Sequence, residues 1–378
     1  KAHKTWNRTR REKEVLSAIK KQIGDMKTEK AFNPGLSPDL EYINVKNGML
    51  DWAKGILKGH SPDYLSTFQL NVQYEKDATF EKWESTLQSW LPDEETIDFL
   101  QEFVGYMLLP DTSFDKAVIL YGSGANGKST FLEMVQELFG RRNLSNISLG
   151  RLSGNTARWE TAEFQDKLAN ICSDIDPEYL SKTGVLKTLI AGETTRGEVK
   201  YGPAFDFKPV TRFIFSANEL PKARDKSEGW YRRFEYIEFP NKFHPSDDDF
   251  DRNLKSKLED ELPGILNWTL EGLRRLKSNG EFTISRSMKR SKNKYIENND
   301  PIKAFAEENL EITEDHKNDY IKSQLVYDDY KNWSERNGYK NYETKKTFSK
   351  VLKRLGAKVD VKNVDYKSQR YYTGIEYK

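Results

Sequence analysis

The chain has 378 residues, of which 36% are hydrophobic and 32% charged, which is enough apolar material for two or three globular domains. Its 61 Lys and Arg residues nearly balance 59 Asp and Glu residues, so the overall charge indicates no class of partner. The single cysteine, Cys172, excludes a disulfide within the chain and favours a cytoplasmic setting, and no apolar run approaches the roughly 20 residues that a membrane span needs.

The first 110 residues predict a mostly helical N-terminal domain. A basic segment with helical spacing of its apolar residues, 1–30, precedes a Pro- and Gly-containing loop at 33–38. Residues 42–50 alternate as strands do around an Asn-Gly turn, and amphipathic helices are expected at 80–90 and 94–109.

The strongest local pattern begins at residue 117. An apolar run that ends at Tyr121 precedes a glycine-rich loop, and a helical pattern follows the loop. Strand, loop and helix in this order are typical of a P-loop, whose backbone N–H groups hold phosphates at a helix N-terminus. We expect Lys128 to reach the β- and γ-phosphates of ATP and the Ser129 hydroxyl to ligate Mg²⁺. The residues expected to bind the nucleotide are Gly122, Ser123, Gly124, Ala125, Asn126, Gly127, Lys128, Ser129 and Thr130.

Residues 116–242 alternate between strand and helix patterns, which predicts a parallel α/β sheet. Further strands are expected at 168–172, 210–215 and 233–239, and the helical patterns continue from 243 to 282. The carboxyl ends of parallel strands meet at one edge of a sheet, so polar residues that follow these strands are candidates for the same site as the P-loop.

Two carboxylates and an amide occupy such positions. Asp174 and Asp176 follow the strand at 168–172, and Asn218 follows the strand at 210–215. We expect Asp174 to hold Mg²⁺, with its share relative to Asp176 left open, and Asn218 to bond water and the γ-phosphate. The alternatives are an ordinary acidic loop and a turn-forming asparagine.

Arg232 and Arg233 immediately precede the last core strand. An arginine placed at a γ-phosphate accelerates its transfer, and we assign this role to the pair, with Arg233 preferred. The alternative is a pair of basic surface residues.

A basic run at 286–294 leads into a C-terminal unit. Three helices are expected at 301–310, 321–337 and 344–355, followed by two strands, and this order is the layout of a winged helix. Residues 340–378 hold eleven Lys and Arg against four Asp and Glu. Cations of the third helix are expected to contact DNA phosphates, the alternative being a solvated face of a protein-binding module. They are Lys345, Lys346, Lys350, Lys353 and Arg354.

Several segments in combination resemble superfamily III helicases, above all the helicase part of phage, plasmid and poxvirus primase–helicases. The motor segments are Lys167–Asp174, Leu186–Gly192, Phe213–Pro221 and Trp230–Phe234. Residues 43–50 and 60–62 resemble the domain that usually precedes the motor in that family. One departure is that the strand at 168–172 leads into Cys-Ser-Asp174 and not into adjacent carboxylates.

The resemblance implies a ring, usually a hexamer, with ATP at subunit interfaces, so that Arg233 would act on a neighbour's nucleotide. Glycines and a proline predict an exposed hairpin at 192–203, and the matching hairpin of the resembled helicases lines the ring channel and grips one DNA strand. Lys200 would contact a phosphate and Tyr201 would stack on a base or sugar, the alternative being a solvated loop.

The sequence therefore predicts an AAA+-like α/β ATPase core at 111–285, between a helical N-terminal (collar) domain at 1–110 and a winged-helix domain at 286–378. We expect an ATP- and Mg²⁺-dependent hexameric helicase that acts on single-stranded and forked DNA in the replication of a phage, plasmid or other mobile element, in the host cytoplasm. Two alternatives remain: an ATPase that loads or remodels replication proteins, and an origin-binding initiator that uses ATP as a switch. A primase domain, if the intact protein has one, is expected before Lys1.

Overall fold

The computed structural model describes most of the chain. The described residues are 40–64, 66–154, 157–175, 179–198, 204–247, 250–313, 320–337, 339, 342–364 and 367–378. Asp176, Lys200, Tyr201 and the helix expected within 1–30 lie outside them, as does the side chain of Asp174.

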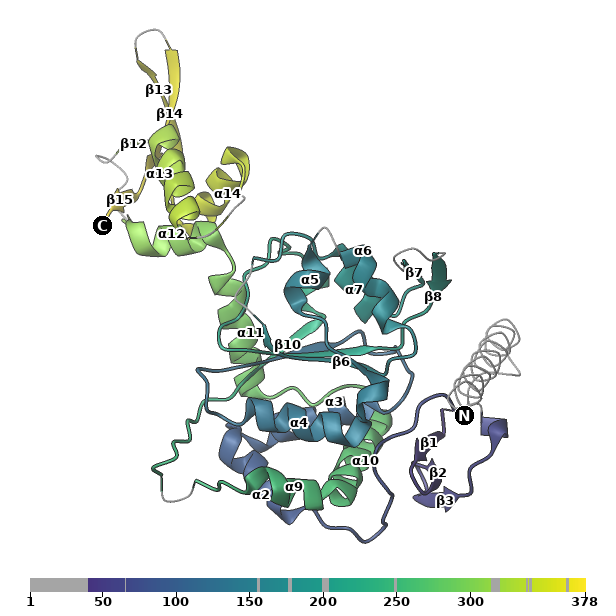
Figure 1. Cartoon of the computed structure of the whole chain (residues 1–378). Helices are drawn as coiled ribbons and strands as arrows, with labels where there is room; N and C mark the ends of the chain where they lie inside the picture. Colours follow the sequence, from purple (N-terminus) through teal and green to yellow (C-terminus); the bar gives the residue numbers. More distant parts are fainter. Residues whose placement is uncertain are drawn as a thin grey trace, which may run out of the picture.

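A five-stranded parallel sheet forms the centre of the molecule (Figure 1). Its strands are β4 (Ala117–Tyr121), β5 (Leu144–Ser145), β6 (Ala169–Ile175), β9 (Arg212–Ala217) and β10 (Phe234–Glu238), in the order β10-β4-β9-β6-β5. All the pairings between neighbouring strands are parallel. The expected α/β class is confirmed for this core, which is consistent with a P-loop ATPase. Only the two-residue strand β5 was not expected, because it is too short to show a periodic pattern.

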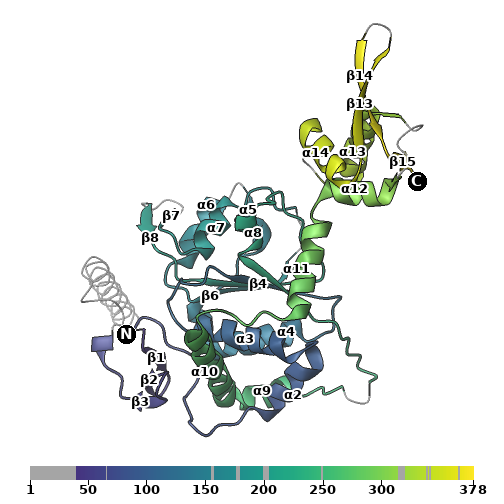
Figure 2. The same ribbon diagram turned by 180° about the vertical axis from the view of Figure 1, so that it is seen from behind.

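Successive side chains of a strand face opposite sides of the sheet, and β4 shows this directly. Val118 and Leu120 belong to the apolar core on one side, and Ala117 and Ile119 to the core on the other. Helices cover both faces (Figures 1 and 2). The first layer consists of α2 (Glu81–Trp90), α3 (Glu94–Met107), α4 (Lys128–Phe139), α9 (Leu254–Asp260) and α10 (Leu262–Asn279), and the second of α5 (Leu149–Ser153), α6 (Ala157–Glu160), α7 (Gly184–Ile190) and α8 (Glu228–Tyr231).

The helices before residue 110 share the first core with the motor. Helices α3 and α10 pack closely because glycines lie at their contact: a Cβ on Gly105 would lie 2.7 Å from the Leu273 nitrogen, and one on Gly272 would lie 2.3 Å from the Gln101 carbonyl oxygen. A division after residue 110 stays a prediction, and the apolar core is continuous across it.

A small antiparallel sheet precedes these helices. It consists of β1 (Tyr42–Val45), β2 (Gly48–Asp51) and β3 (Ile56–Lys58), and the expected Asn-Gly turn joins the first two strands. A second antiparallel pair, β7 (Thr195–Gly197) and β8 (Phe205–Phe207), forms the base of the hairpin expected at 192–203. The short 3₁₀ helices are η2 (Pro62–Tyr64), η3 (Arg141–Asn143) and η4 (Thr161–Phe164).

Helix α11 (Arg286–Asn298) runs from the motor to a C-terminal unit that has an apolar core of its own (Figure 2). The expected three helices and hairpin are present, and the assignment to a winged helix stays a prediction. The elements of this unit are α12 (Pro301–Asn309), β11 (Leu310–Ile312), β12 (Ile321–Lys322), α13 (Ser323–Arg336), α14 (Lys345–Leu355), β13 (Lys358–Val364), β14 (Lys367–Thr373) and β15 (Ile375–Tyr377). None of the described helices combines the length and the apolar character that crossing a bilayer requires.

Candidate nucleotide-binding site

The glycine-rich loop joins the end of β4 to the start of α4, as expected. Its backbone enters the left-handed region at Gly124, Ala125 and Gly127, with φ of 87°, 51° and 91°. Glycine is required at position 127, because a Cβ there would lie 2.4 Å from the ring of Trp90. A helix of the N-terminal part, α2, therefore packs directly against the phosphate-binding loop.

Lys128 is the first residue of α4, and its ammonium group is buried within the loop. Nζ donates hydrogen bonds to the Gly122 carbonyl oxygen at 2.6 Å and to Asn126 Oδ1 at 2.9 Å. Asn126 in turn donates from Nδ2 to the Phe239 carbonyl oxygen at 3.0 Å, which ties the loop to the end of β10. The sequence predicted Asn126 as a nucleotide-binding residue of the loop, and the structure adds a role in positioning Lys128.

A cavity of about 880 Å³ opens beside this loop. Lys128 and Ser129 of the predicted loop line it together with Asn218, which lies 90 positions after Lys128 in the chain. Asn218 and Ser129 are exposed to the cavity. Other lining residues, not expected from the sequence, include Trp90, Ser173, Ser216, Phe243, Arg252 and Lys255.

The backbone of Asp174 lies at the same edge of the sheet. β6 has an irregularity between Cys172, which pairs with Phe215, and Ile175, which pairs with Ala217. Ser173, within this irregularity, lines the cavity. Hydroxyl and carboxylate oxygens are the ligands that Mg²⁺ prefers, so Ser129 and Asp174 have the chemistry of a magnesium site.

Arg232 and Arg233 lie where the strands begin, at the end of the sheet opposite to the P-loop. Phe234, which follows them, pairs with Ala117 at the start of β4, whereas the P-loop follows Tyr121 at its end. At about 3.3 Å per residue the two edges are more than 10 Å apart. The two arginines therefore lie away from the nucleotide site of their own chain.

The two arginines differ in exposure. Arg233 is 8% exposed, donates from Nη1 to the Gly229 carbonyl oxygen at 2.7 Å, and lies 3.8 Å from Asp115 Oδ2. Arg232 is exposed, and its carbonyl oxygen accepts a hydrogen bond from Lys116 Nζ at 2.8 Å. In this conformation Arg232 is the more accessible of the pair, although Arg233 was preferred from the sequence.

The cations of α14 lie as its amphipathic pattern predicts. Phe348 and Leu352 are buried in the core of the C-terminal unit. Lys345 is half-buried, donates to Gln324 Oε1 at 2.7 Å, and has its pKa lowered by burial. The exposed cations are Lys346, Lys350, Lys353 and Arg354.

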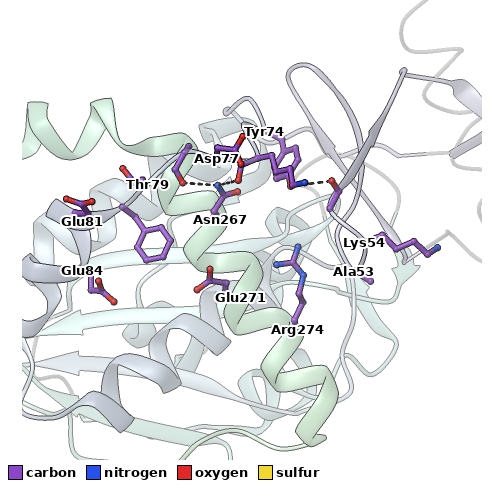
Figure 3. A pocket seen from close by; sticks show the side chains of 14 residues that line it. Ala53, Lys54, Tyr74, Asp77, Thr79, Glu81, Glu84, Asn267, Glu271 and Arg274 are labelled. Carbon is purple, nitrogen blue, oxygen red and sulfur yellow. Dashed lines mark hydrogen bonds between the residues drawn. The ribbon is translucent and has the colours of Figure 1, made fainter.

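A second cavity, of about 610 Å³, lies between the turn after β2 and helix α10 (Figure 3). Asn267 Nδ2 donates to the carbonyl oxygens of Glu75, Lys76 and Ala78 at 2.9, 3.3 and 3.0 Å. These bonds attach the segment before α2 to α10. The walls carry both signs of charge and include no P-loop residue, so this cavity is separate from the nucleotide site.

Family models match three parts of the chain. Residues 1–92 match "D5 N terminal like", residues 120–233 match a family of unknown function (DUF5906), and residues 297–375 match "Poxvirus D5 protein-like".

The curated relatives include two large viral proteins. "Putative helicase L207/L206" of Acanthamoeba polyphaga mimivirus is 26% identical over 237 residues, which is 60% of this chain and 24% of the relative. "Putative helicase 121R" of Invertebrate iridescent virus 3 is 25% identical over 331 residues, which is 77% of this chain and 34% of the relative. The chain thus spans about a quarter to a third of the length of these relatives.

A solved structure described as the apo form of the NrS-1 C-terminal region is 14% identical, with a TM-score of 0.49 over 80% of this chain and 77% of that one. The matches to the family models and to the viral relatives confirm the resemblance drawn from the motifs: the chain is related to the D5 family and to viral proteins described as helicases.

Proposed function

We propose that this chain is the motor of an ATP-dependent DNA helicase that assembles into a ring, usually a hexamer, and moves along single-stranded DNA during replication of a virus, phage or other mobile element. The observation that carries the proposal is the buried Lys128 ammonium, held inside a glycine-rich loop at the mouth of a cavity that Asn218 also lines. The relatedness to viral proteins described as helicases supports the same reading.

In the proposed reaction, phosphate oxygens of ATP replace the Gly122 carbonyl and Asn126 Oδ1 as partners of Lys128. Ser129 and Asp174 would hold Mg²⁺, which supplies charge neutralisation between the β- and γ-phosphates. Asn218 would orient the attacking water without adding negative charge, and Asp176 is the other carboxylate proposed to act with Asp174. Arg232 or Arg233 of a neighbouring subunit supplies positive charge to the γ-phosphate.

The DNA contacts belong to two further parts of the chain. Lys200 and Tyr201, within the hairpin predicted at 192–203, would hold one strand through a phosphate contact and stacking. The exposed cations of α14 would bind backbone phosphates, and this assignment treats the C-terminal unit as a winged helix.

Replacement of Lys128 tests the motor. We expect Lys128→Ala to abolish ATP binding in calorimetry and to reduce the rate of phosphate release at least about 100-fold. The reason is that the variant lacks the positive charge that stabilises the γ-phosphate during its transfer. Lys46→Ala, at an exposed position in the β1–β2 turn, is the matched control and should behave as the unmodified chain.

Strand displacement on forked DNA then separates the alternatives. Unwinding that needs ATP and is lost in Lys128→Ala supports a helicase. Steady hydrolysis without unwinding indicates an ATPase that remodels replication proteins, and ATP binding without turnover indicates an initiator switched by ATP. No ATP uptake by the unmodified, folded chain with DNA would refute the proposal as a whole.

A further inference from the structure

The basic run at 286–294 is not used by the nucleotide site, the hairpin or α14. In the structure it forms most of helix α11, which packs along β10, the edge strand of the central sheet, and continues toward the C-terminal unit (Figures 1 and 2). A charge run is usually a solvated face, so the arrangement of its side chains decides whether it has a further role.

The cations of α11 divide between two sides of the helix. Lys292 faces inward and pairs with the buried carboxylate of Glu235 at 3.0 Å. The four exposed cations lie within an arc of about 140° on the other side, at 100° per residue. They are Arg286, Lys289, Arg290 and Lys294. In the part of the chain that the structure describes, none of these four has an ion-pair or hydrogen-bond partner for its side chain.

The helix that carries them is fixed on its inner side. Ser285 Oγ accepts from the Met288 nitrogen at 3.1 Å and so caps the helix, and Tyr295 OH donates to the Pro221 carbonyl oxygen at 3.0 Å. Ser291 Oγ lies 2.9 Å from the hydroxyl of Tyr121, which donates to it. The anchored helix fixes the backbone positions of the four cations before a partner binds, so the helix itself need not become ordered on binding.

The spacing fits a phosphate backbone. From residue 286 to residue 294 the helix rises about 12 Å at 1.5 Å per residue. A DNA duplex carries one phosphate charge about every 1.7 Å of its axis when both strands are counted, so a surface of this length can contact several phosphates. No carboxylate occurs in α11 before Glu297, which pairs with Lys303 at 3.6 Å.

We propose that the exposed face of α11 formed by Arg286, Lys289, Arg290 and Lys294 is a nucleic-acid phosphate-binding surface that lies between the motor and the C-terminal unit. The proposal rests on the proposed helicase function, from which it takes its partner class. On the inner side of the same helix, Ser291 accepts a hydrogen bond from Tyr121, the residue before the P-loop, so α11 also contacts the strand that leads into the nucleotide loop.

The test is replacement of all four exposed cations by glutamine in the full chain. Binding of a single strand and of a duplex of equal length is measured by fluorescence anisotropy at several salt concentrations. We expect the Kd at moderate salt to rise at least about 10-fold and the slope of log K against log salt to fall by about three, since each phosphate contact contributes about 0.7 to 0.9. Stimulation of phosphate release by DNA should need correspondingly more DNA, while release without DNA stays unchanged.

The matched control removes four positive charges from other parts of the surface. Lys46, Lys76, Arg141 and Arg142 are exposed and lie outside α11 and α14. Their replacement by glutamine should lower the affinity and the slope much less. Thermal unfolding of both variants verifies that they fold.

Three outcomes would overturn the inference. One is an unchanged Kd and salt slope in the α11 variant, and another is an equal loss in the control variant. The third is a loss of assembly in native mass measurement with unchanged DNA affinity, which would make this face a contact between subunits. Failure of the proposed function is a separate result, because it appears as absent ATP turnover in the unmodified chain.

Discussion

Gly127 connects the nucleotide loop to a helix from a distant part of the chain. Its φ of 91° lies in the left-handed region, and the Trp90 ring occupies the space next to its Cα. Both conditions exclude an ordinary side chain, so this glycine is required by the backbone and by packing together.

We therefore expect Gly127→Ala to lower the free energy of unfolding by about 2 kcal/mol or more, through left-handed strain and displacement of Trp90. ATP affinity should fall with it, because the ring and the loop line one cavity. Denaturant unfolding and calorimetry measure the two effects.

Gly280→Ala is the control for strain alone. Gly280 has a φ of 74°, and a Cβ at this position would meet no neighbouring atom within 4 Å. The substitution should cost about 1 kcal/mol and leave ATP affinity unchanged. Equal behaviour of the two variants would show that the Trp90 contact has no effect.

At the scale of elements, helix α2 depends on a carboxylate from a distant part of the chain. Glu261, between α9 and α10, accepts hydrogen bonds from the backbone nitrogens of Lys82 at 3.0 Å and Trp83 at 2.8 Å. These are otherwise unpaired donors at a helix N-terminus, where a negative charge is also favourable.

Glu261→Ala should lower stability by about 1–2 kcal/mol, as loss of a helix cap does, and should weaken ATP binding several-fold because α2 lines the nucleotide cavity. Chemical denaturation and calorimetry provide both numbers. The exposed Glu259 of α9 is the control, and a similar loss in Glu259→Ala would argue against the capping role.

Asp225 joins α7 to the turn before α8. Burial acts to raise the pKa of Asp225, but hydrogen bonds from Lys187, Ser227 and Thr183 outweigh it and hold that pKa well below its ordinary value. A carboxyl whose folded-state pKa is depressed stabilises the protein above its unfolded pKa of about 4, and the contribution is lost as the pH falls further.

Urea unfolding between pH 7 and pH 3 should therefore show a stability that declines toward low pH and a smaller decline in Asp225→Asn. Asp206→Asn, at an exposed position of β8, should keep the decline of the unmodified chain. Parallel curves for the unmodified chain and Asp225→Asn would contradict the assignment.

At the scale of the whole molecule, the nucleotide loop and the two arginines lie at opposite edges of one sheet. If the arginine of one subunit serves the nucleotide of the next, two inactive variants can complement each other. Lys128→Ala and Arg232→Ala should each be inactive alone, and an equal mixture should regain about a quarter of the activity, because a quarter of the interfaces combine both intact residues.

Phosphate release in the presence of DNA measures this recovery. The parallel experiment mixes Arg233→Ala with Lys128→Ala. The Arg233→Ala variant should also unfold at a lower temperature, because Arg233 is buried and its side chain donates a hydrogen bond to the Gly229 carbonyl oxygen. If both mixtures stay inactive, neither arginine acts on the nucleotide of a neighbouring subunit.

Much of the fold follows from short-range patterns. The strand, loop and helix around Lys128, the Asn-Gly turn and the hairpin base at β7 and β8 depend on neighbouring residues and were predicted from them. β5 was missed because two residues are too few to show a periodic pattern. The part that Asn126 plays in positioning Lys128 was missed because Asn126 is held by Phe239, which lies 113 positions away.

By itself the sequence determined the P-loop, the apolar strands beside it and the polar residues at their ends, because period and turn chemistry act over a few residues. Only the tertiary structure decided that Trp90 closes the loop, that Arg232 is exposed while Arg233 is buried, and that α11 turns four cations outward. These features depend on which distant segments pack together, and packing between distant segments leaves no periodic signal in the chain.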